Sequence, residues 1–316
     1  MSVLTRWFVV AAFLVALGAI PLPYYLIAPG TAVDLTHAIT VSGHPPPTDR
    51  YYLTDVTLQR ASAIRLVNLA LPGVKLQSID NVAPAGSRTL EAISTSDMET
   101  SQETAAVVAE RAAGYTVQIP RLRTAVLFVD PASQAGRIFR SGDIITSVDG
   151  HAIDTNLDLR ARVAAHRAGQ RVRVVFEHAG FPQHADVMLV AIDGHARIGI
   201  STQTLPAAAH LAVPVRFGID NIGGPSGGLM FALEIYRALR PGHVVPERKI
   251  AGTGTIAFDG RVGPIEGTQQ KLIAAKRAGA SVFLVPRENY EDIKHERGVR
   301  IVPVDTFADA LRAISG

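Results

Sequence analysis

Apolar positions follow two different spacings along the chain, and together they predict a mixed fold. Short runs rich in β-branched and aromatic residues, typical of strands, occur at 51–58, 250–257, 282–285 and 300–304. Helical spacing of apolar residues occurs at 97–113, 226–239, 268–278, 288–297 and 306–314. Strands that alternate with helices in this way indicate an α/β (α+β) architecture.

A long uncharged stretch lies near the N-terminus. Residues 7–27 contain no charged side chain and are mostly Val, Ala, Leu, Phe and Ile, about the length of a helix that crosses a bilayer. We expect an uncleaved transmembrane anchor, with a cleaved signal peptide as the alternative because Pro21 and Pro23 interrupt the run. Arg6 precedes the run, and the next Lys or Arg is Arg50. The positive-inside rule then predicts a single-pass protein of the cell membrane, with a cytoplasmic N-terminus and the bulk of the chain outside the cytoplasm.

The composition of the chain excludes several classes of partner, cofactor and catalytic group. The chain has 316 residues, enough for about two domains, and its formal net charge is only +3. Its basic residues are scattered, so we expect no nucleic-acid partner. Cysteine is absent, which excludes disulfides, thiol catalysis and cysteine-bound metals. The histidines show no metal-binding spacing and no ATP-binding loop motif occurs, so we expect neither a metal nor another cofactor.

One glycine-rich stretch has the composition of a nucleophile loop. Gly224, Pro225, Ser226 and Gly227 lead directly into an apolar helical pattern. A serine in the first turn of a helix lies beside backbone N–H groups that have no intrahelical partner, and such groups can stabilise an oxyanion. On this stretch alone, Ser226 could equally be a helix cap in an ordinary loop.

A second stretch makes the interpretation specific. Thr253-Gly254, the turn at 260–267 and the helix that begins with Lys271-Leu-Ile-Ala-Ala follow the serine loop, and Lys271 lies 45 residues after Ser226. These pieces resemble the proteolytic domain of the Lon family of Ser-Lys peptidases. The chain departs from the family pattern at Gly227, where alanine is usual, and at Glu266, where glycine is usual.

The resemblance implies a role for each of these residues. Ser226 would be the nucleophile and Lys271 the general base, while Thr253 would orient the lysine. Gly224, Pro225 and Gly227 would shape the loop whose amides hold the oxyanion. A free lysine has a pKa near 10.4, so about three units, or about 4 kcal/mol, must be removed for Lys271 to be neutral near working pH. Apolar residues follow Lys271 and no acidic residue lies within one helical turn of it, so burial is the expected cause.

A different module is predicted between the two parts of this domain. Residues 124–129 read as a strand, and the pattern at 130–153 resembles bacterial PDZ domains. Residues 156–166 would form the helix of the peptide groove. PDZ domains bind an extended chain end as an added strand, so the resemblance implies a peptide ligand. A small structural β domain without a ligand is the alternative.

These interpretations divide the chain into four segments. They are a cytoplasmic stub and anchor at 1–30, a first protease segment at 31–117, the PDZ domain at 118–194 and a second protease segment at 195–316. The resemblance implies a membrane-anchored, ATP-independent serine endopeptidase that cuts unfolded or flexible polypeptides. Lon proteolytic domains commonly assemble into rings, so it also suggests a homo-oligomer.

Two other functions stay open at this point. The chain could be a catalytically inactive, anchored PDZ adaptor on a protease scaffold. The Gly-x-Ser-x-Gly pattern around Ser226 also fits an esterase of the α/β-hydrolase type, for which Asp292 and His295 are the candidate partners. That alternative would leave Lys271 without a role.

Overall fold

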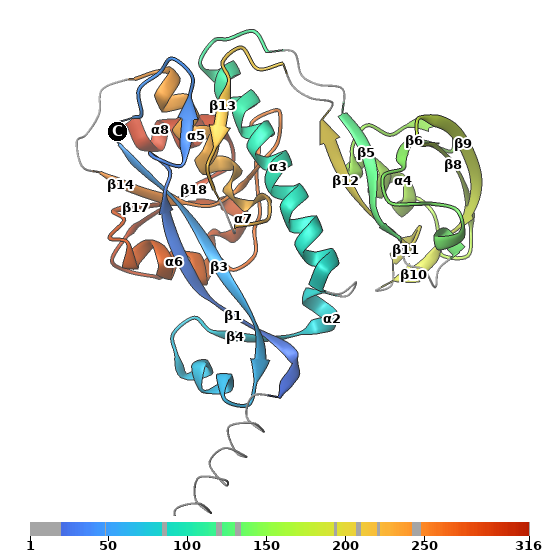
Figure 1. The fold of residues 1–316 in the computed structure, drawn as a ribbon, viewed down its shortest axis with the longest axis horizontal. Helices are drawn as coiled ribbons and strands as arrows, with labels where there is room; N and C mark the ends of the chain where they lie inside the picture. The colour runs from blue at the N-terminus through green and yellow to red at the C-terminus, as the bar shows by residue number, and fades with distance from the viewer. Residues whose placement is uncertain are drawn as a thin grey trace, which may run out of the picture.

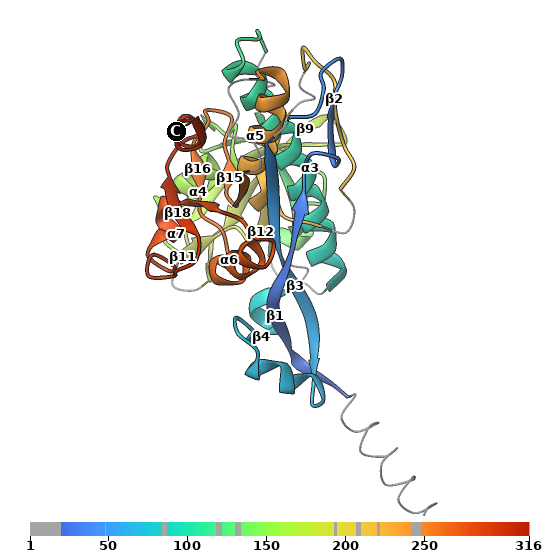
Figure 2. The same cartoon turned by 90° about the vertical axis from the view of Figure 1, so that its left-hand side faces the viewer.

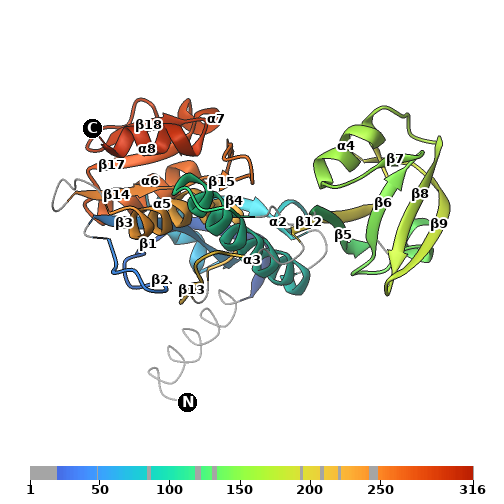
Figure 3. The ribbon, with the colours of Figure 1, turned by 90° about the horizontal axis from the view of Figure 1, so that it is seen from above.

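Two hydrophobic cores organise the chain. The computed structural model describes residues 20–47, 49–83, 87–117, 122–129, 134–192, 195–206, 210–219, 222–241 and 248–315. The first core combines residues from both ends of the sequence, whereas the second is built from residues 126–198. Figures 1 and 3 show the second body beside the first, on the side where helix α3 (Ser87–Ala112) lies.

A mixed six-stranded sheet forms the centre of the first body. Its order is β18-β17-β14-β3-β1-β4. The strands are β1 (Pro21–Asp34), β3 (Arg50–Ser62), β4 (Lys75–Ser78), β14 (Lys249–Gly252), β17 (Val282–Pro286) and β18 (Arg300–Val304). The four strands from β18 to β3 run parallel, and β1 is antiparallel to β3 and β4. Because β3 pairs with β14, the sheet joins segments from before and after the second core.

Alternation along the strands places apolar side chains on both faces of this sheet. Val282 and Leu284 belong to the first core, while Phe283 and Val285 belong to a third cluster on the other face. Helices cover both faces, as expected for strands that are apolar on each side. Those of the first core are α3, α5 (Gly228–Leu239) and α8 (Phe307–Ser315), and those of the third cluster are α6 (Thr268–Arg277) and α7 (Arg287–Tyr290).

Helix α5 is the most deeply buried helix among the described residues of the first body. Every residue from Gly228 to Ile235 is buried. A helix that is apolar all round is stable only inside a protein, so the sequence of α5 fixes its position at the centre of the core. The serine loop at its N-terminus is therefore attached to a rigid element.

Shorter elements complete the first body. Two short antiparallel pairs lie outside the main sheet, β2 with β13 and β15 with β16. The bounds of these elements and of the remaining helical turns are β2 (Ile39–Val41), β13 (Val215–Phe217), β15 (Thr255–Ile256), β16 (Val262–Gly263), η1 (Arg65–Ala70), α2 (Ile79–Val82) and η3 (Pro225–Gly227).

The second body is a β sheet covered by one helix. The path through the sheet is β12-β5-β6-β8-β9, with β7 paired to β6, and β10 pairs separately with β11. Helix α4 begins after a capping box formed by Thr155 and Asp158. The elements are β5 (Leu122–Val129), η2 (Gln134–Arg137), β6 (Ile144–Val148), β7 (His151–Ala152), α4 (Asn156–Ala164), β8 (Arg171–His178), β9 (Phe181–Met188), β10 (Val190–Ile192), β11 (His195–Arg197) and β12 (Ile200–Pro206).

The end of the predicted anchor is wrong. Residues 21–27, assigned to a transmembrane helix, belong to strand β1, where Leu26 pairs with Gln59 of β3 and with Leu76 of β4. Pro21 and Pro23 disfavour a helix and are tolerated near the start of a strand. Residues 7–19 lie outside the described residues. No helix within the described ranges is long and apolar enough to span a bilayer.

Three other predictions differ from the structure. Helix α3 begins at Ser87 rather than near 97, so Ser96 lies inside the helix and is not its cap. The helix predicted at 288–297 is limited to α7, and turns follow it. Strand β12 pairs with β5, so the second sheet continues past the predicted domain boundary at 194. In the last case the pairing partner, β5, comes from a distant part of the sequence.

Candidate active site

A tight turn presents Ser226 at the start of α5. Gly224 has a φ of +85°, a conformation that glycine adopts without strain. Pro225, Ser226 and Gly227 then form a single 3-10 turn that continues into the helix. Ser226 is partly exposed, whereas Gly227 is buried. The serine is thus held by the core on one side and open to solvent on the other.

Helix α3 holds the serine loop in place. The N–H of Gly224 donates to the carbonyl of Ser94 at 2.7 Å. The hydroxyl of Ser101 donates to the carbonyl of Pro225 at 3.0 Å. Sequence reasoning missed Ser94 and Ser101, because a small polar residue within a helical pattern gives no sign of a partner more than a hundred positions away.

Lys271 reaches the serine from the opposite face of the sheet. It lies in the first turn of α6, and its Nζ is 2.5 Å from Ser226 Oγ. Thr253 directly follows β14, and its hydroxyl lies 3.2 Å from the same Nζ and donates to the Ser226 carbonyl at 3.1 Å. The structure therefore brings together the three side chains predicted from the sequence, and Gly224, Pro225 and Gly227 lie in the same loop.

Burial sets the electrostatics of the lysine. Lys271 is 3 % exposed. Loss of solvation lowers its pKa from 10.5 to about 8, while the carboxylates of Asp55 and Glu266 act in the opposite direction. The expected depression of the pKa is present, and no acidic residue lies within one helical turn of Lys271, but two carboxylates from further away oppose the depression. Asp55 comes from β3, more than two hundred positions away, and Glu266 lies just beyond one helical turn.

Several backbone amides lie in or beside the serine turn. The N–H of Gly228 donates within the turn to the Pro225 carbonyl, and the N–H of Gly254 donates to the Ser226 carbonyl at 2.8 Å. The amides of Ser226 and Gly227 lie in the first helical turn, where N–H groups have no intrahelical acceptor. They are the donors that could face a developing oxyanion beside Ser226 Oγ.

Packing accounts for glycine at position 227. A Cβ there would lie 2.8 Å from Phe231 Cζ and 2.9 Å from Leu53 Cδ1, closer than real contacts allow. Alanine at this position would therefore force the Phe231 ring or the loop to move. The local core of this chain is fitted to the smaller residue.

The alternative partners for Ser226 are not placed beside it. Asp292 and His295 are exposed and lie in the turns after α7. The described contacts of the Ser226 hydroxyl include Lys271 and neither of these residues. The arrangement does not favour the α/β-hydrolase interpretation.

Comparison with protein families decides the class of domain. Residues 191–313 match the family model of the Lon protease (S16) C-terminal proteolytic domain, and residues 64–189 match that of the PDZ domain. The chain contains a Lon-type proteolytic domain. A PDZ domain precedes it in the sequence, although the PDZ match begins within the first body, before the second sheet.

Curated relatives match this Lon-type domain over part of their length. The chain is 41% identical over 109 residues to the Lon protease of Campylobacter concisus, a match that covers 33% of this chain and 13% of the relative. It is 37% identical over 107 residues to Lon protease 2 of Bacillus subtilis, covering 33% and 18%. The matches span less than a fifth of these relatives. The homology supports a serine peptidase.

Two solved structures are similar to part of the chain. The PDZ domain of an SdrC-like protein from Listeria monocytogenes is 26% identical, covering 28% of this chain and 93% of that chain, with a TM-score of 0.25. A solution structure from Geobacillus thermodenitrificans is 28% identical, covering 28% and 92%, with a TM-score of 0.21.

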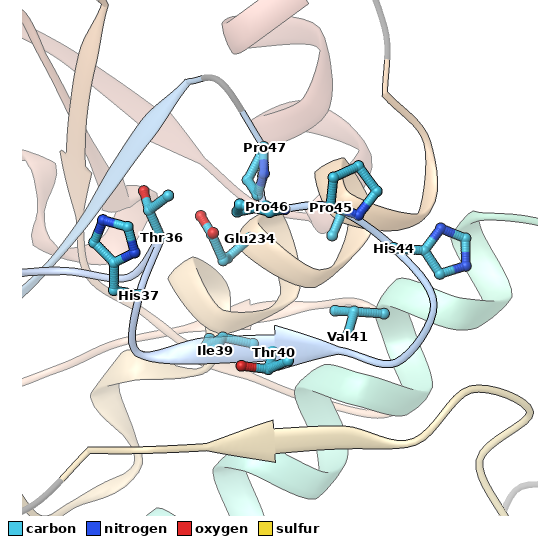
Figure 4. Close-up of a pocket in the computed structure, with 11 residues that line it drawn as sticks. Thr36, His37, Ile39, Thr40, Val41, His44, Pro45, Pro46, Pro47 and Glu234 are labelled. Carbon is cyan, nitrogen blue, oxygen red and sulfur yellow. The ribbon is translucent and has the colours of Figure 1, made fainter.

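A separate buried acid lies further along α5. Glu234 is 1 % exposed and lines a cavity of about 200 Å³. Figure 4 shows its carboxylate directed between Thr36 and Pro46. Neither carboxylate oxygen has a hydrogen-bond partner among the described residues. Burial, followed by the nearby charges of Asp34 and Asp49, raises the pKa of Glu234 to about 8, so the acid is mostly neutral at pH 7.

A metal site is not apparent in the described part of the chain. Within those ranges no three His, Asp or Glu side chains are grouped so that they could hold an ion.

Proposed function

We propose that the protein is a serine endopeptidase that uses Ser226 and Lys271 as a catalytic dyad. The observation that carries the proposal is a buried amine with a pKa of about 8 at 2.5 Å from a partly exposed serine hydroxyl. A serine hydroxyl attacks a peptide only when a base removes its proton, and a lysine is a base only when neutral. At pH 7, roughly one Lys271 in ten would be neutral, against fewer than one in a thousand for an exposed lysine.

Acylation follows from this arrangement. Ser226 Oγ attacks the carbonyl carbon of the substrate while its proton passes to Lys271 Nζ. The amides of Ser226 and Gly227 stabilise the oxyanion of the tetrahedral intermediate. The C–N bond then breaks as Lys271 returns the proton to the leaving amine, which leaves an ester on Ser226 and a neutral lysine.

Deacylation reverses the roles of the groups. Lys271 takes a proton from water, and the resulting hydroxide attacks the ester carbon. The second tetrahedral intermediate then collapses: the ester C–O bond breaks as Lys271 Nζ returns its proton to Ser226 Oγ, which releases the new carboxyl end of the substrate and restores the serine hydroxyl. Thr253 keeps the amine aligned in both steps, because its hydroxyl contacts Lys271 Nζ and is itself fixed by the Ser226 carbonyl.

The rest of the chain would deliver the substrate. Strand β12 lies at one end of the second sheet, and Thr204 of this strand bonds to Asn156 at the start of α4. An extended peptide added to β12 beside α4 would be held in the PDZ manner. We further propose an anchor within residues 7–19, an extracytoplasmic location and action without ATP on unfolded or flexible polypeptides. A homo-oligomer is proposed from the Lon resemblance alone.

Product analysis tests the dyad. The full chain is incubated with a disordered test protein, and the fragments are identified by mass spectrometry. We expect cleavage by wild type and none by Ser226→Ala or Lys271→Ala. Lys276→Ala is the matched control, since Lys276 lies on the same helix and pairs with Glu296 at the surface. Fragments unchanged by Lys271→Ala would reject the mechanism.

A labelling experiment addresses the inactive adaptor. A fluorophosphonate probe should label wild type and not Ser226→Ala. Absence of labelling in wild type that still binds an extended peptide would favour the adaptor. Labelling that survives Lys271→Met and is lost with His295→Ala would favour the esterase.

A further inference from the structure

Exposed apolar side chains are concentrated at one end of the first body. Of the ten large apolar residues that are exposed in the described part of the chain, eight lie between residues 20 and 76. We call them the apolar tip: Ile20, Tyr24, Leu58, Ile64, Val67, Leu69, Leu71 and Leu76. The other two, Phe181 and Met188, are in β9 of the second body.

The fold gathers these residues into one projecting element. Strands β3 and β4 flank β1, and the 3-10 helix η1 lies in the connection between β3 and β4. No residue of η1 is buried, and Val67 is 72 % exposed. Figures 1 and 2 show this connection at the lower end of the molecule, away from α5 and α8. A soluble protein rarely exposes so many clustered apolar side chains without a partner.

The charged side chains of residues 56–79, which include most of the apolar tip, have one sign. Residues 56–79 contain Arg60, Arg65 and Lys75 and no Asp or Glu, and all three basic residues are exposed. Arg60 Nε donates to the Leu22 carbonyl at 3.1 Å, and Arg65 donates to the Arg60 carbonyl at 3.1 Å. Two of the three cations are thus held against the backbone of the tip. Apolar side chains next to exposed cations fit the surface of an anionic lipid bilayer, which is apolar inside and negatively charged at its boundary.

We propose that the apolar tip inserts into the interfacial region of an anionic lipid bilayer. The inference rests on the proposed anchor, because Ile20 in the tip directly follows the uncharged sequence at 7–19. Two contacts with the same membrane, the anchor and the tip, would fix the orientation of the proteolytic domain above the surface. A symmetric contact between two tips would bring like charges together, so a second copy of the chain fits less well.

Depth-dependent quenching tests the tip separately from the anchor. Trp7 is the only tryptophan, so Trp7→Phe provides a silent background for Val67→Trp in the full chain. Phe181→Trp in the same background is the matched control, since Phe181 is also exposed but lies in the second body. The variants are reconstituted into phosphatidylcholine–phosphatidylglycerol vesicles that contain brominated lipid, and flotation measures binding independently.

Each outcome decides the question. We expect blue-shifted and quenched emission from position 67, and solvent-like, unquenched emission from position 181. Leu71→Trp should repeat the result if Val67→Trp perturbs the turn. Floating protein with unquenched tryptophan at 67 and 71 overturns the tip and leaves the anchor intact, whereas protein that does not float overturns both. The chain has no cysteine, so Val67→Cys can be oxidised alone, and efficient disulfide dimers between floating chains would show that the tip faces another copy.

Discussion

Replacing Lys271 by methionine should stabilise the proteolytic domain while abolishing its activity. In the folded chain the pKa of Lys271 is about 8, against 10.5 for the unperturbed group. Below pH 8 both the folded and the unfolded chain carry the protonated amine, and the folded chain bears the cost of burying it. A depression of about 2.5 units corresponds to about 3 kcal/mol of lost stability at pH 7.

The sign of the pH dependence distinguishes this cost from ordinary packing effects. Between pH 8 and 10.5 the folded amine is neutral and the unfolded one is still protonated, so wild type becomes more stable by about 1.4 kcal/mol per pH unit. The advantage of Lys271→Met over wild type should therefore shrink by roughly 2 kcal/mol between pH 7 and pH 9.5. Loss of the contacts to Ser226 and Thr253 adds an offset that changes little over this range.

Hydrogen–deuterium exchange in increasing urea can report this domain alone. Peptides that cover α5 and α6 are followed by mass spectrometry in the full chain at pH 7 and pH 9.5, with rates corrected for pH. Lys276→Met is the control, because Lys276 is on the same helix and its amine pairs with Glu296 at the surface. A Lys271→Met variant that is less stable than wild type at both pH values, or a difference that does not change with pH, would refute the reasoning.

Three further predictions use the same structure. The kcat/KM of wild type for a fluorogenic peptide should rise about tenfold per pH unit below pH 8 and then level off, because only the neutral amine of Lys271 is a base. A flat profile from pH 6 to 9 would contradict this prediction. Glu234→Gln should raise the urea midpoint more at pH 8 than at pH 5. The pKa of Glu234 is about 8 in the folded chain against 4.5 for the free group, so the free energy of unfolding of wild type falls by up to about 5 kcal/mol as pH rises through this window, and the variant avoids this loss. An equal effect at both pH values would argue against the buried, neutral acid. Gly227→Ala should lower the free energy of unfolding, measured in urea, by about 1–3 kcal/mol because the added methyl group overpacks against Phe231. Adding Phe231→Leu should recover part of that loss. An unchanged midpoint in the single variant would show that the loop relaxes freely.

The contact between Ser226 and Lys271 could be predicted because its signals are local. The glycine-rich turn before Ser226 and the apolar residues after Lys271 are contiguous in the sequence. Each motif specifies its own helix, and a known family supplies the spacing between them. The strands β17 and β18 were predictable for the same reason, since a short apolar run bounded by turns predicts a strand without knowledge of its partners.

The remaining features depend on distant contacts. Residues 21–27 form a strand because β3 and β4 pair with them, and their apolar composition alone fits a membrane helix as well. Asp55 influences Lys271 only because β3 passes beside α6. Glu234 looks like an ordinary polar position of a helix until the fold encloses it. Such effects arise from tertiary packing, which no local pattern encodes.

Helix α3 bears on two regions of the protein at once. Ser94 and Ser101 hold the turn that carries Ser226, while Ser96 and Thr100, within the same two turns of helix, bond to Gln203 of β12. The span from residue 94 to residue 101 is only about 10 Å along a helix axis. A small rotation of this one helix would shift the Ser226 hydroxyl and the β12 edge of the second sheet together. A movement of the second body could therefore be transmitted to the serine turn through α3 alone, without rearrangement of either hydrophobic core.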